Sequence, residues 1–265
     1  MSAVIIHEGS SPVILAFPHG GTDVPASIWQ NLSENGRRLA DTDWHIYQLY
    51  NGLLETATTV QATFHRYVVD ANRDPSGVSL YPGQNTTGLC PSTDFDGLQI
   101  WNDGYELDET EIEQRRLNFH EPYHAALTKQ IQRVKKQHGI AVLYDCHSIR
   151  SKISYLFEGV LPDFNIGTYD GKSCADAFQK SVADDCAASV GYTDVLNGRF
   201  KGGWTTRHYA KPEDNIHAIQ MELALSAYAS ENEPWSYEAE RADKLRPELK
   251  RLLINLEELA FEYSK

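Results

Sequence analysis

Short apolar runs alternate with longer helical segments along this chain, and that alternation restricts the fold more than any other feature. Apolar runs typical of buried strands lie at residues 12–17, 58–64, 141–144 and 216–225. Strands separated by helices are typical of α/β proteins. We therefore predict an α/β fold with a mixed, mostly parallel central sheet flanked by helices. The 265 residues show no linker or repeat, so we expect a single domain over residues 1–265.

Helical periodicity and local composition predict the remaining elements. Two further strands are expected in RYVVDANRD (66–74) and YTDVLN (192–197). Residues 76–104 are rich in Gly, Pro, Ser, Thr, Asn and Asp, and an irregular loop of that length is usually functional. Pro122 should interrupt the longest helical segment. Helices are expected over residues 41–57, 107–139, 173–190 and 237–263.

Composition and charge exclude several classes of protein. The net charge is −13 and no Lys/Arg cluster stands out beyond residues 133–136, so we expect no nucleic-acid partner. No apolar run approaches the roughly 20 residues that span a membrane, so no membrane partner is expected. The N-terminus lacks the features of a secretory signal, and four widely spaced cysteines indicate reduced thiols, as in a cytoplasmic protein. No feature indicates a particular oligomeric state.

The stretch AVLYDCHSIRS (141–151) changes abruptly from apolar to polar. Its first four residues read as a buried strand, and Asp145, Cys146, His147 and Ser148 follow. This is either an ordinary polar loop or the carboxyl end of a central strand, where α/β proteins bind ligands. A thiol nucleophile with His147 as its base is disfavoured, because adjacent strand residues point to opposite faces.

Other strand ends carry similar groups. His19 follows the first strand in PHGG, and Asn72 and Arg73 follow another. Glu222 lies within the apolar run AIQMELAL, where an acid would be desolvated and needs a partner or a function. In a parallel sheet these ends converge on one edge. Their joint occurrence is more informative than any one of them.

Two histidines and a carboxylate at one sheet edge suit a zinc site with an open position for water. Asp43, or its neighbour Asp41, could supply the carboxylate from the start of the helix expected over 41–57. Each candidate also has an ordinary alternative. His19 could be a turn residue, His147 a hydrogen-bonded core residue, and Asp43 an acid that interacts with the helix dipole.

An acidic protein that binds an anionic small molecule must place arginines locally. Arg207, in TTRHY, has no adjacent acid, whereas Arg73 could simply pair with Asp70 or Asp74. His124 could face the site or lie on the surface. No GxGxxG, GxxxxGK[ST] or GxSxG pattern is present, so nucleotide phosphates and a serine nucleophile have no support.

Eight sequence blocks in fixed order carry a family resemblance. They lie between about Pro18 and Tyr228 and read FPHGG, DTDWH, VDANRDP, PYH, YDCHSIRS, LPDFNIGT, GGWTTRHY and IQMELALSAY. The ordered set resembles the N-formylglutamate amidohydrolases. This implies a phosphorylase/hydrolase-like α/β fold, distantly related to zinc carboxypeptidases and aspartoacylases. It also implies a divalent metal, with zinc as the first expectation.

The activity implied by the resemblance is hydrolysis of N-formyl-L-glutamate to formate and L-glutamate, the last step of a histidine degradation route. The nearest alternative is another N-acyl amino-acid deacylase or a carboxypeptidase-like metallohydrolase on the same scaffold. Carboxypeptidase-like relatives carry HxxE, but Thr22 stands at the matching position here, so the carboxylate ligand must come from elsewhere. The roles implied are metal binding by His19, Asp43 and His147, general base catalysis by Glu222, and binding of a substrate carboxylate by Arg73.

The implied substrate is a small dicarboxylate, and arginine pairs bidentately with carboxylates. Arg73 and Arg207 are therefore expected to clamp it, with Asn72 in support. His124 or a backbone N–H could help to stabilise the oxyanion. The loop over residues 76–104 is expected to close over the site and exclude water.

Overall fold

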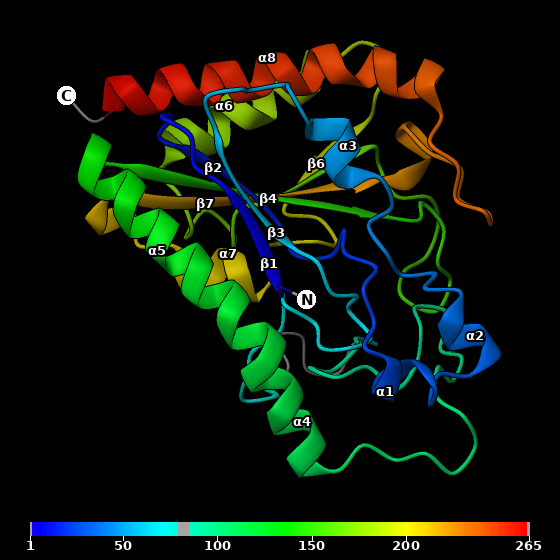
Figure 1. Ribbon diagram of the computed structural model, residues 1–265. Helices are drawn as coiled ribbons and strands as arrows, with labels where there is room; N and C mark the ends of the chain where they lie inside the picture. Colours follow the sequence, from blue (N-terminus) through cyan, green and yellow to red (C-terminus); the bar gives the residue numbers. More distant parts are fainter. Residues whose placement is uncertain (1, 79–84, 264–265) are drawn as a thin grey trace.

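A mixed seven-stranded sheet forms the centre of the computed structural model, which describes residues 2–78 and 85–263 (Figure 1). The strand order is β1-β3-β2-β4-β7-β5-β6. Neighbouring strands are parallel except at β1–β3 and β5–β7, so the predicted mixed, mostly parallel sheet is confirmed. The strands are β1 (Val4–His7), β2 (Val13–Phe17), β3 (Thr58–Ala62), β4 (Ala141–Ile149), β5 (Phe164–Gly167), β6 (Asp194–Leu196) and β7 (Ile216–Ala224).

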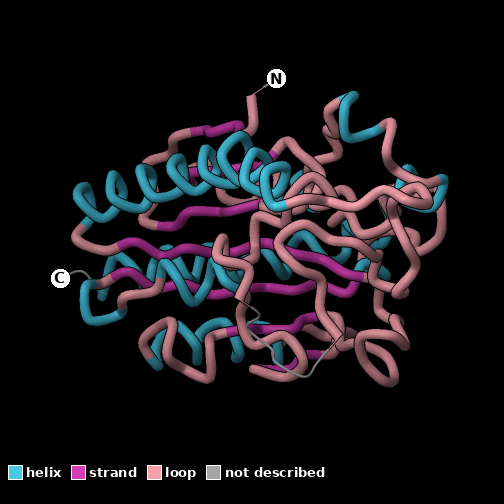
Figure 2. The backbone as a smooth tube through the Cα atoms, turned by 90° about the horizontal axis from the view of Figure 1, so that it is seen from below, coloured by secondary structure: helices cyan, strands magenta, loops and turns pink. Residues whose placement is uncertain are grey.

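Helices cover both faces of this sheet. The long helix α5 crosses one face, and α8 with α6 lies on the other (Figure 1). Figure 2 shows most of the loops gathered at one end of the sheet. The helices are α1 (Ala26–Trp29), α2 (Glu34–Arg37), α3 (Ile46–Tyr50), α4 (Glu109–Arg115), α5 (Glu121–His138), α6 (Asp176–Ala187), α7 (Trp204–Tyr209) and α8 (Ala239–Tyr263).

Strand alternation divides the core into two layers. On β4, Tyr144 and Cys146 pack with α6 and α8, whereas Leu143 packs on the α5 side. Because side chains alternate along a strand, Asp145 and His147 share the face of Leu143. The prediction that Cys146 and His147 point to opposite faces is therefore confirmed.

Three local predictions were wrong. Residues 66–74 form turns rather than a strand, and within them Arg66 pairs with Asp70, four residues later. The helix expected over 41–57 is reduced to α3, since His45 has a left-handed φ of 60° that a helix does not continue through. The strand β4 continues through Ile149, so the polar residues after Tyr144 lie within it. The sequence also gave no indication of α7.

The long helical segment was predicted correctly. The helices α4 and α5 follow one another with a π-helical turn over Arg116–His120 between them. Pro122 has no N–H to donate, and it stands in the first turn of α5, directly after the π-helical turn. The regular helix is therefore interrupted next to Pro122, as predicted. The helix ends at Gly139, which adopts a left-handed φ of 74°.

Two expectations from composition can be checked directly. Within residues 2–78 and 85–263, no helix is both long and apolar enough to cross a membrane. The cysteines Cys90, Cys146, Cys174 and Cys186 are free thiols, as expected.

Candidate active site

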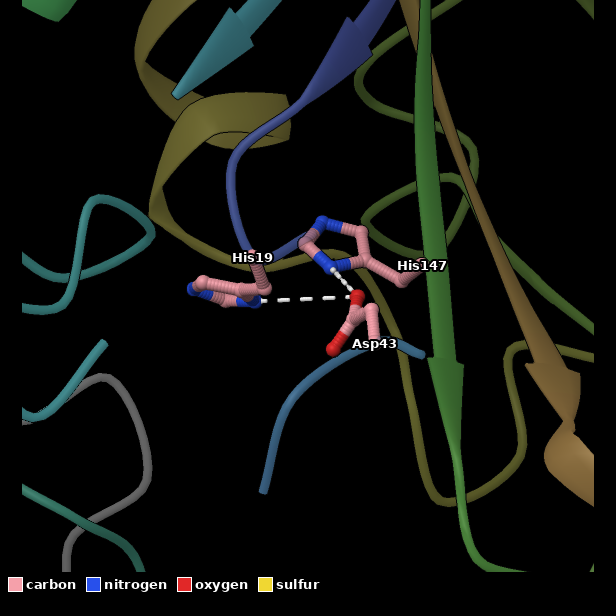
Figure 3. Close-up of side chains that lie close together, drawn as sticks. All are labelled: His19, Asp43 and His147. Atoms are coloured by element: carbon pink, nitrogen blue, oxygen red, sulfur yellow. Dashed lines mark hydrogen bonds and ion pairs between the residues drawn. The ribbon is translucent and has the colours of Figure 1, made fainter. Parts of the chain in front are cut away.

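The side chains of His19, Asp43 and His147 meet at one end of the sheet (Figure 3). His19 follows β2, Asp43 precedes α3, and His147 belongs to β4. Asp43 Oδ2 lies 3.2 Å from Nδ1 of His147 and 3.9 Å from Nδ1 of His19. All three residues are buried, and one ligand atom from each lies within 4.8 Å of the others. These are donors that could hold a divalent metal ion.

Backbone contacts fix this arrangement. The amide of Asp43 donates to the carbonyl oxygen of His19 at 3.1 Å, and the amide of Ser148 donates to Asp43 Oδ2 at 3.1 Å. A Cβ at Gly21 would lie 2.4 Å from the carbonyl oxygen of Thr63. Gly21 therefore lets the chain after β2 approach the end of β3, which helps to place His19.

A carboxylate stands behind each histidine ring. His19 Nε2 donates to Asp70 Oδ1 at 2.7 Å, and His147 Nε2 lies 3.0 Å from Asp145 Oδ2. At His19, the hydrogen bond from Nε2 to Asp70 favours the tautomer whose Nδ1 lone pair faces the centre, as in metal-bound histidines. Sequence reasoning missed both roles, although Asp145 stands two positions before His147, on the same face of the strand.

Burial and charge act together on these groups. Burial alone would lower the pKa of His147, but Asp145 and Asp43 raise it well above the usual range. Burial and Arg66 lower the pKa of His19 despite the neighbouring acids. The site therefore has one imidazole stabilised as a cation and one stabilised as a neutral base when no metal is bound.

The buried guanidinium of Arg66 offsets the negative charge, a role that the sequence did not indicate. Its Nη2 donates to Asp70 Oδ2 at 2.7 Å, and its Nη1 lies 3.7 Å from Asp43 Oδ1. Burial would raise the pKa of Asp70, but Arg66, Arg73 and His19 hold it well below its usual range. Asp70 is therefore ionised and serves as the common partner of His19 and Arg66.

We expect Arg66→Leu to destabilise the metal-free protein by about 3–5 kcal/mol, because removing one member of a buried ion pair leaves its partners uncompensated. Urea denaturation of metal-free protein measures this. Arg38→Leu is the matched control: its pair with Glu233 at 3.1 Å is exposed, so a change under about 1 kcal/mol is expected. Equal effects of the two substitutions would contradict the role given to Arg66.

Glu222 lies beside His147 in the parallel pairing of β7 with β4. Burial raises the pKa of Glu222 to about 8, although His147 opposes that shift. Gln220 fixes the carboxylate: its Oε1 accepts from the amide of Gly203 at 2.7 Å, so its Nε2 donates to Glu222 Oε2 at 3.1 Å. A buried acid with a raised pKa at a sheet edge is a candidate for proton transfer.

Several of these residues line one pocket. His19, His147 and Glu222 lie along its lining, and so do Asn72 and Arg73. Apolar side chains from other segments complete it: Phe95, Ile149, Leu156 and Phe200.

The long loop contributes to the pocket through Asn85, Thr87 and Phe95. Residues 79–84 of this loop lie outside the described residues. Its closure over the site stays a prediction.

Asn72 and Arg73 were predicted at the site, and the structure brings both there. Asn72 Nδ2 lies 3.2 Å from His147 Nε2, and its Oδ1 accepts from the amide of Thr205 at 2.9 Å. A Cβ at Gly203 would lie 2.4 Å from Asn72 Nδ2, so glycine is required there. Arg73 Nε donates to the carbonyl oxygen of Thr87 at 2.8 Å.

His124 and Arg207, both predicted at the site, are not among the described residues that line the pocket. His124 Nε2 donates to the carbonyl oxygen of Ala71 at 2.8 Å, and its Nδ1 lies 2.9 Å from the hydroxyl of Tyr209. With both nitrogens occupied, His124 cannot contact an oxyanion directly, and it does not line the pocket. The helix α7 carries Arg207 to Tyr169, with the guanidinium 4.5 Å from the ring, so Arg207 is also outside the pocket lining.

Asp41 and Asp43 differ in position, and a further arginine lies at the pocket. Asp41 accepts from the amide of Phe95 at 2.9 Å and is not part of the cluster, which takes its carboxylate from Asp43. Arg199, which the sequence did not single out, lines the pocket. Its selection from sequence would have required knowing how the chain runs between β6 and α7.

Comparison with known proteins adds an independent finding. The family model described as N-formylglutamate amidohydrolase matches residues 11–229. The N-formylglutamate deformylase of Pseudomonas putida is 42% identical over 248 residues, which are 93% of this chain and 92% of the relative. The N-formylglutamate deformylase of Pseudomonas aeruginosa is 43% identical over 250 residues, 94% of each chain.

Two solved structures share the fold. The crystal structure of an N-formylglutamate amidohydrolase from Ralstonia eutropha JMP134 matches with a TM-score of 0.80 at 24% identity, covering 99% of this chain and 98% of that one. A protein from Agrobacterium tumefaciens matches with a TM-score of 0.72 at 19% identity, covering 97% and 95% of the two chains.

Proposed function

The chain belongs to the N-formylglutamate amidohydrolase family and is a hydrolase acting on an amide, and from this premise we propose that it cleaves N-formyl-L-glutamate to formate and L-glutamate with the help of a divalent metal. The observation that carries the metal dependence is the buried group of His19, Asp43 and His147 beside the buried acid Glu222. The activity is that of the two Pseudomonas relatives.

The donor set fits zinc. Two imidazoles and one carboxylate leave a fourth position open, which is typical of catalytic zinc sites. The hydrogen bond from His19 Nε2 to Asp70 favours ligation through Nδ1 of His19. A divalent metal there would supply Lewis acidity and lower the pKa of water.

Proton transfer is assigned to Glu222. Its carboxylate takes a proton from the attacking water, whose oxygen bonds to the formyl carbon. The bond between that carbon and the amide nitrogen then breaks, and Glu222 delivers the proton to the leaving amine. Its place beside His147 and its contact with Gln220 support this role.

The α-carboxylate of the substrate is assigned to Arg73 and Asn72, which line the pocket close to His147. Arg207, expected to share in the clamp, lies with its guanidinium 4.5 Å from the Tyr169 ring and is not among the described residues that line the pocket. His124 acts indirectly: it binds the carbonyl oxygen of Ala71, next to Asn72, and so helps to position that side chain.

Some broader expectations belong to the same proposal. A single domain over residues 1–265 and a distant relation to zinc carboxypeptidases are supported by the continuous sheet and by the two histidines with Glu222. A cytoplasmic location is supported by the free thiols, and a role at the end of histidine degradation by the substrate named for the relatives. The net charge of −13 supports a small-molecule partner rather than nucleic acid.

Formate release measured together with bound metal tests this function. Protein purified without chelator should contain close to one metal ion per chain and release formate from N-formyl-L-glutamate. Chelation should stop release, and divalent metal should restore it. Metal without formate release, followed by hydrolysis of other N-acyl amino acids, would instead support a different deacylase. Release that is insensitive to chelation would contradict the metal dependence.

Gln220→Leu should lower kcat by roughly 10–100-fold with little change in KM, because outer partners of a catalytic site typically contribute that much. The substitution removes the donor that holds Glu222 and the acceptor for the amide of Gly203. Steady-state kinetics on metal-loaded protein measures the effect. Gln130→Leu, which removes a buried glutamine bonded to Glu8 far from the pocket, should leave kcat unchanged. An unchanged kcat in Gln220→Leu would remove Gln220 from this role.

A further inference from the structure

Three arginines line the pocket, and two of them are committed to its metal-binding end. Arg66 donates to Asp70 at 2.7 Å, and Arg73 Nη1 lies 3.8 Å from the same carboxylate. Asp70 in turn accepts from His19. The charges of Arg66 and Arg73 therefore act close to the metal ligands.

Arg199 is attached to a different part of the pocket. Its Nε donates to the carbonyl oxygen of Leu156 at 3.3 Å, and its guanidinium lies 5.4 Å from the centre of the Phe200 ring. Both Leu156 and Phe200 line the pocket. They also belong to a small apolar cluster with Phe95 and Ile149, separate from the two main core layers. Arg199 therefore places a positive charge beside the apolar side of the pocket, which Phe95, Ile149, Leu156 and Phe200 form.

The substrate of the proposed function likewise has two charged groups, and an apolar segment separates them. Its α-carboxylate is bonded to the carbon that bears the formamide nitrogen, so it stays close to the reacting centre. Its side-chain carboxylate lies beyond two methylene groups. Methylene groups suit an apolar wall, and a terminal carboxylate suits a planar guanidinium fork.

We propose that Arg199 binds the side-chain carboxylate of the substrate and so selects for an acidic amino acid. This inference rests on the proposed function, since it assigns the second carboxylate of that substrate. Arg73 with Asn72 holds the α-carboxylate, and Phe95, Ile149, Leu156 and Phe200 contact the methylene groups. A guanidinium pairs bidentately with a carboxylate and forms no such ion pair with a neutral amide, so the acidic substrate should be preferred.

The test compares Arg199→Gln with wild type on N-formyl-L-glutamate and on N-formyl-L-glutamine, whose side chains end in a carboxylate and in a neutral amide of nearly the same shape. The kcat/KM for the glutamate derivative should fall by about 100-fold, since a charge-assisted pair is lost. The value for the glutamine derivative should change little, so the preference for the acid should largely disappear. Arg199→Lys should recover part of the preference, because it restores the charge without the fork.

Arg37→Gln is the matched control, because Arg37 also lies over an aromatic ring, 6.0 Å from Trp29, and is outside the pocket lining. It should keep the wild-type preference. Equal losses on both substrates in Arg199→Gln, or an unchanged preference, would overturn the assignment of Arg199. Wild-type protein that releases no formate from N-formyl-L-glutamate would instead overturn the proposed function.

Discussion

Glu222→Gln is expected to lower kcat for formate release by about 10³-fold or more while bound metal stays unchanged. The amide has nearly the shape of the carboxylate but cannot take a proton from water or return one to the amine, and general acid–base catalysis contributes up to about 10⁴-fold. Glu222 is not in the His19–Asp43–His147 group, so metal binding does not depend on it. Single-turnover kinetics and elemental analysis of the same preparation measure the two quantities.

Two further variants make this result specific. Glu222→Asp keeps the acid and moves it by one methylene group, so its rate should fall between those of wild type and Glu222→Gln. Glu213→Gln, at an exposed position away from the pocket, should behave as wild type. A Glu222→Gln protein with near-normal kcat would remove Glu222 from the base role. Loss of metal in that variant would mean that Glu222 is itself a ligand.

The sequence was sufficient to predict the side of the sheet to which a side chain points, where this follows from the alternation along its own strand. Alternation along β4 placed His147 opposite Cys146, and the desolvated acid Glu222 was visible within an apolar strand. The ordering of apolar runs and helices likewise predicted a mixed, mostly parallel sheet. These inferences need only local periodicity and the rule that strand ends converge.

The sequence failed where direction depends on contacts between distant segments. Arg207 was chosen because no acid stands beside it in the chain, yet the unforeseen helix α7 places it against Tyr169. Arg199, which stands 8 positions before Arg207 in the sequence, lines the pocket. Periodicity also overestimated the helix at 41–57, because apolar spacing does not report the left-handed turn at His45.

The largest loss of metal is expected from Asp43→Asn, and Asp41→Asn is its matched control. Asp43 Oδ2 faces both histidine rings, at 3.2 and 3.9 Å, whereas Asp41 accepts an amide from Phe95. Asp43→Asn should weaken metal binding by more than the roughly 10–100-fold typical of outer partners, and formate release should fall in parallel. Asp41→Asn should retain both, since it is not in the cluster.

Thermal unfolding separates loss of a ligand from loss of the fold. A ligand that binds the native state alone stabilises it by about 2.7 kcal/mol when present at 100 times its Kd. Adding Zn²⁺ to metal-free wild type and to metal-free Asp41→Asn should therefore raise Tm. Asp43→Asn should keep a cooperative transition, but its Tm should respond far less to the same Zn²⁺ concentration. The reverse pattern, with Asp41→Asn insensitive to Zn²⁺ and Asp43→Asn responsive, would make Asp41 the carboxylate ligand. It would contradict a metal site formed by His19, Asp43 and His147.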